Sequence, residues 1–138
     1  MISSRNIADL LPPVQERCRN FLYACRKEGI ELLVTCTYRD IESQKALYAQ
    51  GRTKPGKIVT RANGGQSFHQ YRVAFDTVPL VNGKPVWEDE HLWHRVGALG
   101  QSFGLEWAGT WKRFSEEPHF QFTGGLTITD FLNGKTLS

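Results

Sequence analysis

Three side chains that could bind a transition metal lie far apart in the sequence: His69, Asp76 and His119. Asp76 lies inside the apolar segment VAFDTV, where a carboxylate is costly unless a cation or strong donors neutralise it. Two-residue alternation in PHFQF puts His119 on one strand face and Phe120 on the other. If these two strands are neighbours, His119 and Asp76 converge, and His69 at the strand entrance completes a triangle.

Two imidazoles and one carboxylate are typical of a catalytic zinc site, in which the fourth position is left for water. Zinc in such a site lowers the pKa of water towards ~7 and polarises a carbonyl group. An alternative stays open, because an arginine or lysine partner would also neutralise Asp76. A second pair, His91 and His94, has helical spacing that could bring both to one metal. Its segment EDEHLWH is more typical of the exposed start of an amphipathic helix.

The elements that would position these residues follow from periodicity, capping residues and turn signals. Residues 51–67 are rich in turn formers and cations and are expected to form a long surface loop. The fold class expected is α+β, with a small, mainly antiparallel sheet, helices packed on one side and one domain over residues 1–138. Helices are expected over residues 12–28, 40–50, 89–103 and 128–133, and strands over 31–38, 72–80, 84–87 and 118–122.

Composition restricts the possible function classes. The chain of 138 residues is 40% hydrophobic and 22% charged, with a formal net charge of +3 that is spread along the sequence. Without a basic block interleaved with aromatic residues, a nucleic-acid site is not expected, and no apolar run is long enough for a membrane span. The N-terminus lacks the features of a secretory signal, so synthesis without export is expected. The three cysteines, an odd number without a CxxC pair, are expected to be buried core thiols and not metal ligands.

Four segments carry a resemblance to a known family. SFHQYRVAFD resembles the Ser-x-His-x-x-Gly-x-Ala-x-Asp signature of the D-alanyl-D-alanine-type zinc peptidases, which include the VanX and VanY enzymes and many phage L-alanyl-D-glutamate endolysins. EEPHF is similar to the second signature, Asp/Glu-x-Pro-His-Phe. TYRDIESQKALYAQGRT and GLEWAGTWKRF resemble the flanking segments, in the same order. The resemblance spans about residues 31–122 and implies a compact α+β fold with one Zn²⁺ held by His69, Asp76 and His119.

The resemblance also implies a general base. In the family this base lies three residues before the second histidine, which is Glu116 here. It would take a proton from water and later pass it to the leaving amine. Strict strand alternation would put Glu117 on the face of His119 instead, although Pro118 can break that alternation. We follow the family spacing and expect Glu116 to be catalytic.

Three further residues match family positions that act on substrate. Arg39 is expected to be both catalytic and substrate-binding, either by pairing with the substrate carboxylate or by stabilising the oxyanion. A surface ion pair with an acidic neighbour is the alternative for Arg39. Gln44 and Ser67 match positions of polar substrate contacts, and an ordinary exposed helix residue is the alternative for Gln44.

Departures from the signatures concern substrate preference more than hydrolysis. Arg72 replaces a glycine, so either this position tolerates ordinary φ or the arginine side chain lines the cleft. Ala108 replaces another glycine, and Thr110 stands where relatives often carry aspartate. No metal ligand is lost by these changes.

The resemblance implies a zinc metallopeptidase that hydrolyses an amide bond in peptidoglycan stem peptides. L-alanyl-D-glutamate endopeptidase activity of a phage or prophage endolysin is the first expectation. D,D-carboxypeptidase activity and a catalytically silent, zinc-containing wall-binding module are the alternatives. We expect a monomer that does not insert into a membrane. It would be made in the cytoplasm, depend on a holin for release and act at the cell wall.

Overall fold

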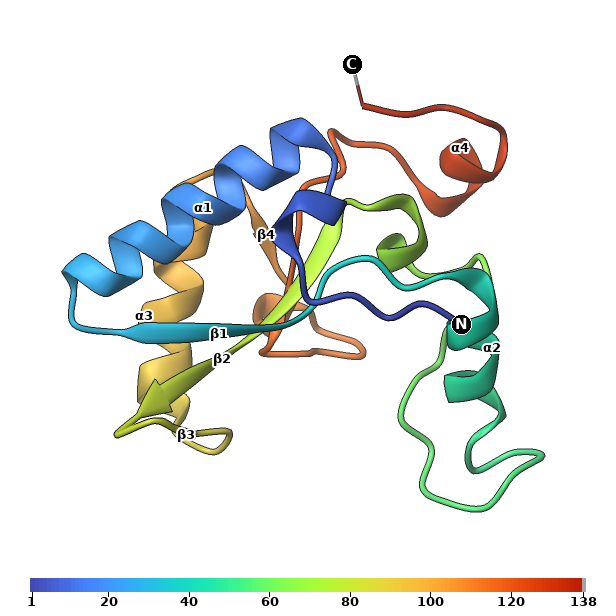
Figure 1. Ribbon diagram of the computed structural model, residues 1–138, viewed down its shortest axis with the longest axis horizontal. Helices are drawn as coiled ribbons and strands as arrows, with labels where there is room; N and C mark the ends of the chain where they lie inside the picture. Colours follow the sequence, from blue (N-terminus) through green and yellow to red (C-terminus); the bar gives the residue numbers. More distant parts are fainter. Residues whose placement is uncertain (138) are drawn as a thin grey trace.

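A five-stranded antiparallel sheet lies at the centre of the computed structural model, which describes residues 1–137 (Figure 1). Its strands follow the order β1-β2-β5-β4, and β3 pairs with the far end of β2. The strands are β1 Glu31–Cys36, β2 Ala74–Val81, β3 Lys84–Pro85, β4 Glu106–Trp107 and β5 His119–Gln121; the helices are α1 Pro12–Lys27, α2 Ile41–Ala49, α3 Glu90–Gln101 and α4 Ile128–Leu132; the 3-10 turns are η1 Ile7–Asp9, η2 Phe68–Tyr71 and η3 Ala108–Thr110.

Local sequence signals explain where the helices begin and end. Asp40 and Asp89 cap α2 and α3, each accepting a hydrogen bond from the backbone N–H three residues later. Gly29 ends the α1 region with a φ of 79°, which glycine adopts without steric cost. Within residues 1–137, no helix combines the length and the apolar character that crossing a bilayer requires.

One face of the sheet carries core phenylalanines, and the other carries the candidate ligands Asp76 and His119. Phe75 and Phe120 stack with ring centroids 5.8 Å apart, and Phe21 of α1 lies 4.8 Å from Phe120. This apolar face packs against α1 and α3, whereas α2 and the loop that follows it lie at the other end of the molecule (Figure 1). In the β2–β5 ladder, Asp76 is the register partner of His119. Because side chains alternate along a strand, both project from the face opposite the phenylalanines.

Some features differ from the expectations. β1 ends at Cys36, where the register with β2 shifts, instead of continuing to residue 38. Residues 37–40 pair instead with the N-terminal residues 2–4 through backbone hydrogen bonds. The two-residue strand β4 was not expected at all. It exists because it pairs with β5, a contact that local sequence does not encode.

Arg72 corrects both interpretations of its departure from the family signature. Its φ is 63°, so the backbone keeps the left-handed conformation that glycine favours. The side chain does not line either of the two cavities that border Asp76. Its guanidinium lies 3.9 Å from the ring centroid of Tyr38 and donates to the backbone oxygen of Asp9 at 2.9 Å. These contacts offset the strain.

Replacing Arg72 separates the strain from the contacts. An Arg72→Ala protein loses both contacts and keeps a Cβ in the left-handed region, whereas Arg72→Gly loses the contacts but relieves the strain. We therefore expect the glycine variant to be more stable than the alanine variant by about 1 kcal/mol in urea unfolding. Equal stabilities would mean that the strain is no larger than the extra conformational entropy that glycine loses on folding.

Candidate metal centre and active site

Three elements bring the candidate ligands His69, Asp76 and His119 together. His69 lies in η2, which Ser67 caps by accepting a hydrogen bond from the His69 backbone N–H. The His69 Nε2 lies 3.4 Å from Asp76 Oδ2, and the His119 Nδ1 lies 3.1 Å from Asp76 Oδ1. The two imidazole centroids are 5.2 Å apart, and both rings are buried. The carboxylate therefore lies between two inward-facing ring nitrogens.

The outer ring nitrogens of both histidines already have partners. The Nδ1–H of His69 donates to the Thr37 carbonyl oxygen at 2.8 Å, and the Nε2–H of His119 donates to Gln121 Oε1 at 2.8 Å. In a neutral imidazole the inner nitrogen then carries a lone pair. Two lone pairs and a carboxylate that face one another require a cation between them. The donor set therefore fits a divalent metal ion such as zinc.

The pKa values of His69 and Asp76 shift in opposite directions because each group stabilises the charged form of the other. Burial alone would lower the pKa of His69, but the Asp76 carboxylate outweighs it and raises this pKa to about 10. Burial would raise the pKa of Asp76, but the neighbouring imidazoles outweigh it and hold this pKa well below its usual range. A proton on His69 thus occupies the place that a metal ion would take.

Cys36 corrects one interpretation of the cysteines. Cys18 and Cys25 are buried core thiols as expected, but Cys36 belongs to a cluster with His69 and Asp76 whose ligand atoms lie within 4.8 Å of one another. Its Sγ lies 3.8 Å from the Nδ1 of His69, the nitrogen already bonded to a backbone carbonyl. We therefore assign His119, whose free nitrogen faces Asp76, to the candidate ligand set in preference to Cys36.

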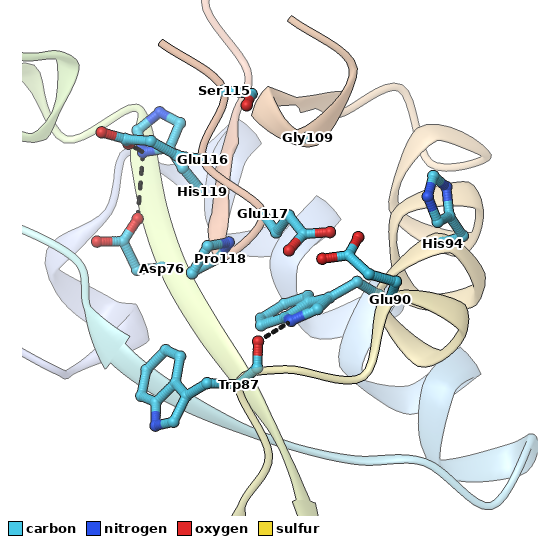
Figure 2. A pocket seen from close by; sticks show the side chains of 11 residues that line it. Asp76, Trp87, Glu90, His94, Gly109, Ser115, Glu116, Glu117, Pro118 and His119 are labelled. Carbon is cyan, nitrogen blue, oxygen red and sulfur yellow. Dashed lines mark hydrogen bonds and ion pairs between the residues drawn. The ribbon is translucent and has the colours of Figure 1, made fainter.

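The two candidate bases point in different directions. The Glu116 Oε2 lies 3.9 Å from the His119 Nδ1, and Figure 2 shows this carboxylate beside the imidazole. Glu117 is directed towards Glu90, and burial together with this second carboxylate raises the pKa of Glu117. The local chain thus departs from strict alternation before Pro118. This geometry favours Glu116 as the base.

Two cavities of about 580 and 750 Å³ meet at the candidate site. Asp76, Glu116 and His119 line both of them. The smaller cavity also contains Trp87 and the Glu90–Glu117 pair. The larger is lined by residues of the loop between positions 59 and 68 and by Trp111 and Phe114. A peptide that crosses the candidate metal could therefore occupy space on both sides.

Three further predicted residues differ in their access to this space. Arg39 and Ser67 line the larger cavity, whereas Gln44 is 0% exposed and lines neither cavity. Gln44 Oε1 accepts a hydrogen bond from Arg39 at 3.0 Å, and its Nε2 donates to the Ala62 carbonyl at 2.8 Å. The alternative of an ordinary exposed helix residue is therefore wrong: the enclosed amide of Gln44 supports Arg39 and the loop, and a substrate contact of this residue stays a prediction.

Arg39 makes internal contacts and no surface ion pair. Besides Gln44, its guanidinium contacts Cys36 Sγ at 3.3 Å, and no ion pair with an acidic neighbour occurs among residues 1–137. These two contacts leave further N–H groups of the fork for a ligand. Cys36 and the Thr37 carbonyl are site components that sequence reasoning missed, because only the tertiary structure brings them to His69.

The competing histidine pair does not form a comparable site. In the part of the chain that the structure describes, His91 and His94 belong to no cluster of three or more potential ligands. His94 packs edge-on against Trp107, with centroids 5.6 Å apart, and His91 is exposed at the start of α3. This agrees with the exposed, amphipathic start of a helix.

A family model described as VanY: D-alanyl-D-alanine carboxypeptidase matches residues 8–125, which is most of the chain. The chain belongs to the VanY family. Among curated relatives, the peptidoglycan L-alanyl-D-glutamate endopeptidase CwlK of Bacillus subtilis (strain 168) is 36% identical over 123 residues, covering 83% of this chain and 74% of CwlK. The L-alanyl-D-glutamate peptidase of Listeria phage A118 is 29% identical, covering 87% of this chain but 40% of the phage protein.

Solved structures share the VanY-family fold. The Serratia marcescens L-Ala D-Glu endopeptidase ChiX superposes with a TM-score of 0.64 at 22% identity, covering 94% of this chain and 92% of ChiX. A mutant of the vancomycin resistance D,D-pentapeptidase VanY, in complex with Zn(II), also gives 0.64, at 17% identity, over 90% of this chain and 84% of that one. These likenesses confirm the α+β fold with an antiparallel sheet.

Proposed function

We propose that this VanY-family chain is a zinc-dependent hydrolase of bacterial peptidoglycan stem peptides, with His69, Asp76 and His119 as its metal ligands. The observation that carries the proposal is the convergence of one nitrogen from each of two imidazoles with one carboxylate. The other nitrogen of each imidazole is already hydrogen-bonded. Zinc bound there would polarise the scissile carbonyl and make a water molecule acidic enough to attack at neutral pH. The 36% identity to CwlK supports the substrate class.

The remaining groups of the site supply proton transfer and orientation. Glu116 borders both cavities and is exposed enough to reach a water molecule. It takes the proton of the attacking water and delivers it to the leaving amine. Arg39 holds a substrate carboxylate or the developing oxyanion, since its fork borders the larger cavity and Gln44 fixes its position. Ser67 caps η2 and offers a polar contact at the wall of this cavity.

L-alanyl-D-glutamate endopeptidase activity is our first choice for the reaction. The curated relatives from Bacillus subtilis and Listeria phage A118 are both named for that activity. The description of the family favours D,D-carboxypeptidase activity, which is our second choice. The two reactions leave different products, so a digest separates them.

The test is a digest of purified muropeptides, read by mass spectrometry, with zinc-loaded protein and with chelator-treated protein. New L-alanine C-termini are expected, and cleavage should stop on complete zinc removal and return when zinc is restored. Loss of only the terminal D-alanine would support the carboxypeptidase instead. Absence of any cleavage by the zinc-loaded protein would support the silent module, and full activity without metal would exclude the metal mechanism.

The wider setting is also a proposal. We treat residues 1–138 as one peptidase domain, which is supported by a hydrophobic cluster that draws buried residues from Leu10 to Phe131. We further propose a monomer that reaches the cell wall through a lesion made by a holin, in line with the similarity to a phage peptidase. Light scattering tests the first point, and lysis on expression with and without a holin tests the second.

A further inference from the structure

The outer nitrogen of His119 is bonded to a side chain and not to the backbone. Gln121 lies two residues further along β5, on the same strand face, and its Oε1 accepts the His119 Nε2–H at 2.8 Å. Gln121 is 3% exposed, so water has little access to this contact. His69 differs, because its outer nitrogen is bonded to the fixed carbonyl of Thr37. The tautomer of His119 therefore depends on which way one amide is turned.

A carboxylate fixes the direction of that amide. Gln121 Nε2 donates to Glu106 Oε2 at 3.1 Å, and the Thr123 hydroxyl donates to the other oxygen, Oε1, at 3.2 Å. Glu106 is the register partner of Gln121 in the β4–β5 ladder. An ionised carboxylate only accepts hydrogen bonds, so the NH₂ group of Gln121 must face Glu106. The amide oxygen must then face His119, whose Nε2 must carry the proton.

We propose that Gln121 and Glu106 are positioning residues that hold His119 as an Nδ1 ligand. With the amide turned the other way, the imidazole would carry its proton on Nδ1, the atom that faces Asp76 at 3.1 Å. That proton would occupy the position that a metal ion needs. The chain Glu106–Gln121–His119 thus fixes a proton on Nε2, which leaves Nδ1 as the nitrogen that can bind a metal ion. The inference rests on the proposed metal site.

The experiment measures zinc affinity by competition with a chromophoric chelator, and urea unfolding of each metal-free variant reports folding. Gln121→Leu removes the acceptor and is expected to weaken zinc binding by about 10–100-fold. Glu106→Gln frees the amide to turn and should weaken it less. Gln121→Glu alone sets two carboxylates face to face and should also weaken binding. Gln101→Leu, at an exposed position on α3, is the matched control with unchanged affinity.

The decisive variant exchanges the two groups. In the double variant Gln121→Glu/Glu106→Gln, the carboxylate at position 121 accepts from His119, and the amide at position 106 donates to that carboxylate while accepting from Thr123. The hydrogen bonds donated by His119 and Thr123 keep their direction, and the bond between positions 121 and 106 is kept with donor and acceptor exchanged, so zinc affinity should return to within about threefold of wild type. If Gln121 and Glu106 only stabilised the fold, the substitutions would change the free energy of unfolding and not the zinc affinity. Recovery of zinc affinity in the double variant is therefore not expected from a purely structural role.

Several results would overturn this inference. Zinc binding by Gln121→Leu as tight as that of wild type is one, and a double variant that binds no better than Gln121→Glu is another. If Gln121→Leu does not fold, the comparison between the exchanged pair and its single variants still decides. Failure of the wild-type protein itself to bind zinc would contradict the proposed function instead, so the two failures remain distinct.

Discussion

Replacing Glu116 with glutamine is expected to lower peptide cleavage by about 10²–10⁴-fold while zinc binding is retained. The Glu116 Oε2 lies 3.9 Å from His119, and its side chain is 56% exposed where the two cavities meet. A carboxylate in this position can take a proton from water, and a glutamine amide of nearly the same shape cannot. The loss should therefore fall on kcat, measured on purified muropeptides.

The neighbouring glutamate provides the matched control. Glu117→Gln removes the same charge one residue further along, but that carboxylate is directed towards Glu90 in the smaller cavity. We expect this variant to keep its activity within a few-fold of wild type and to bind zinc equally well. If Glu117→Gln lost activity while Glu116→Gln kept it, the base would be Glu117, as strict strand alternation suggests.

Asp76→Asn is expected to weaken zinc binding by at least about 100-fold, and hydrolysis with it. The carboxylate lies between the two inward ring nitrogens and supplies the only negative charge among the candidate ligands. An amide at this position gives a poorer, neutral ligand. Zinc content after dialysis and a competition titration measure the loss. Asp9→Asn is the control, because Asp9 lies beside Arg72 and away from the candidate metal site. This variant should bind zinc as wild type does.

The same substitution should change how the stability of the metal-free protein depends on pH. Burial lowers the pKa of His69, but Asp76 outweighs it, so the pKa in the folded state is about 10 against 6.5 for an unperturbed histidine. A raised folded pKa stabilises the protein fully below about pH 6.5, and this contribution is lost as the pH rises through about 10. The lowered pKa of Asp76 acts in the opposite direction, so its contribution is lost in acid.

Urea unfolding of metal-free samples at several pH values measures this dependence. Between about pH 6.5 and 10, wild type should lose stability, and Asp76→Asn should show a much flatter profile because the carboxylate that raises the His69 pKa is gone. Parallel profiles for the two proteins would mean that the His69–Asp76 pair does not hold a proton in solution.

The sequence identified the elements well wherever a signal is local. The helices expected over residues 12–28, 40–50 and 89–103 are all present within one or two residues of the expected bounds. Helical spacing and a capping carboxylate depend on neighbours only a few positions away. Alternation in PHFQF likewise predicted that Phe120 packs into the core, away from His119.

Features that depend on pairing between distant segments could not be predicted. Strand β4 is two residues long and has no periodicity of its own, so only its ladder with β5 defines it. Cys36 was interpreted as a core residue because nothing in a strand-like segment reveals that its end lies beside His69. The residue type at position 72 predicts neither of the partners of Arg72. Asp9 and Tyr38 lie far from it in the sequence, and only the fold brings them to its side chain.

By itself, the sequence determined which residues are candidates for the chemistry, because two signatures hold the ligand types and the acidic residues at fixed spacings. The tertiary structure decided how those residues are oriented. The register of β2 with β5 sets His119 opposite Asp76, and that of β4 with β5 sets Glu106 opposite Gln121. Local spacing chooses the face of a strand, but only packing between strands determines which atoms meet across it.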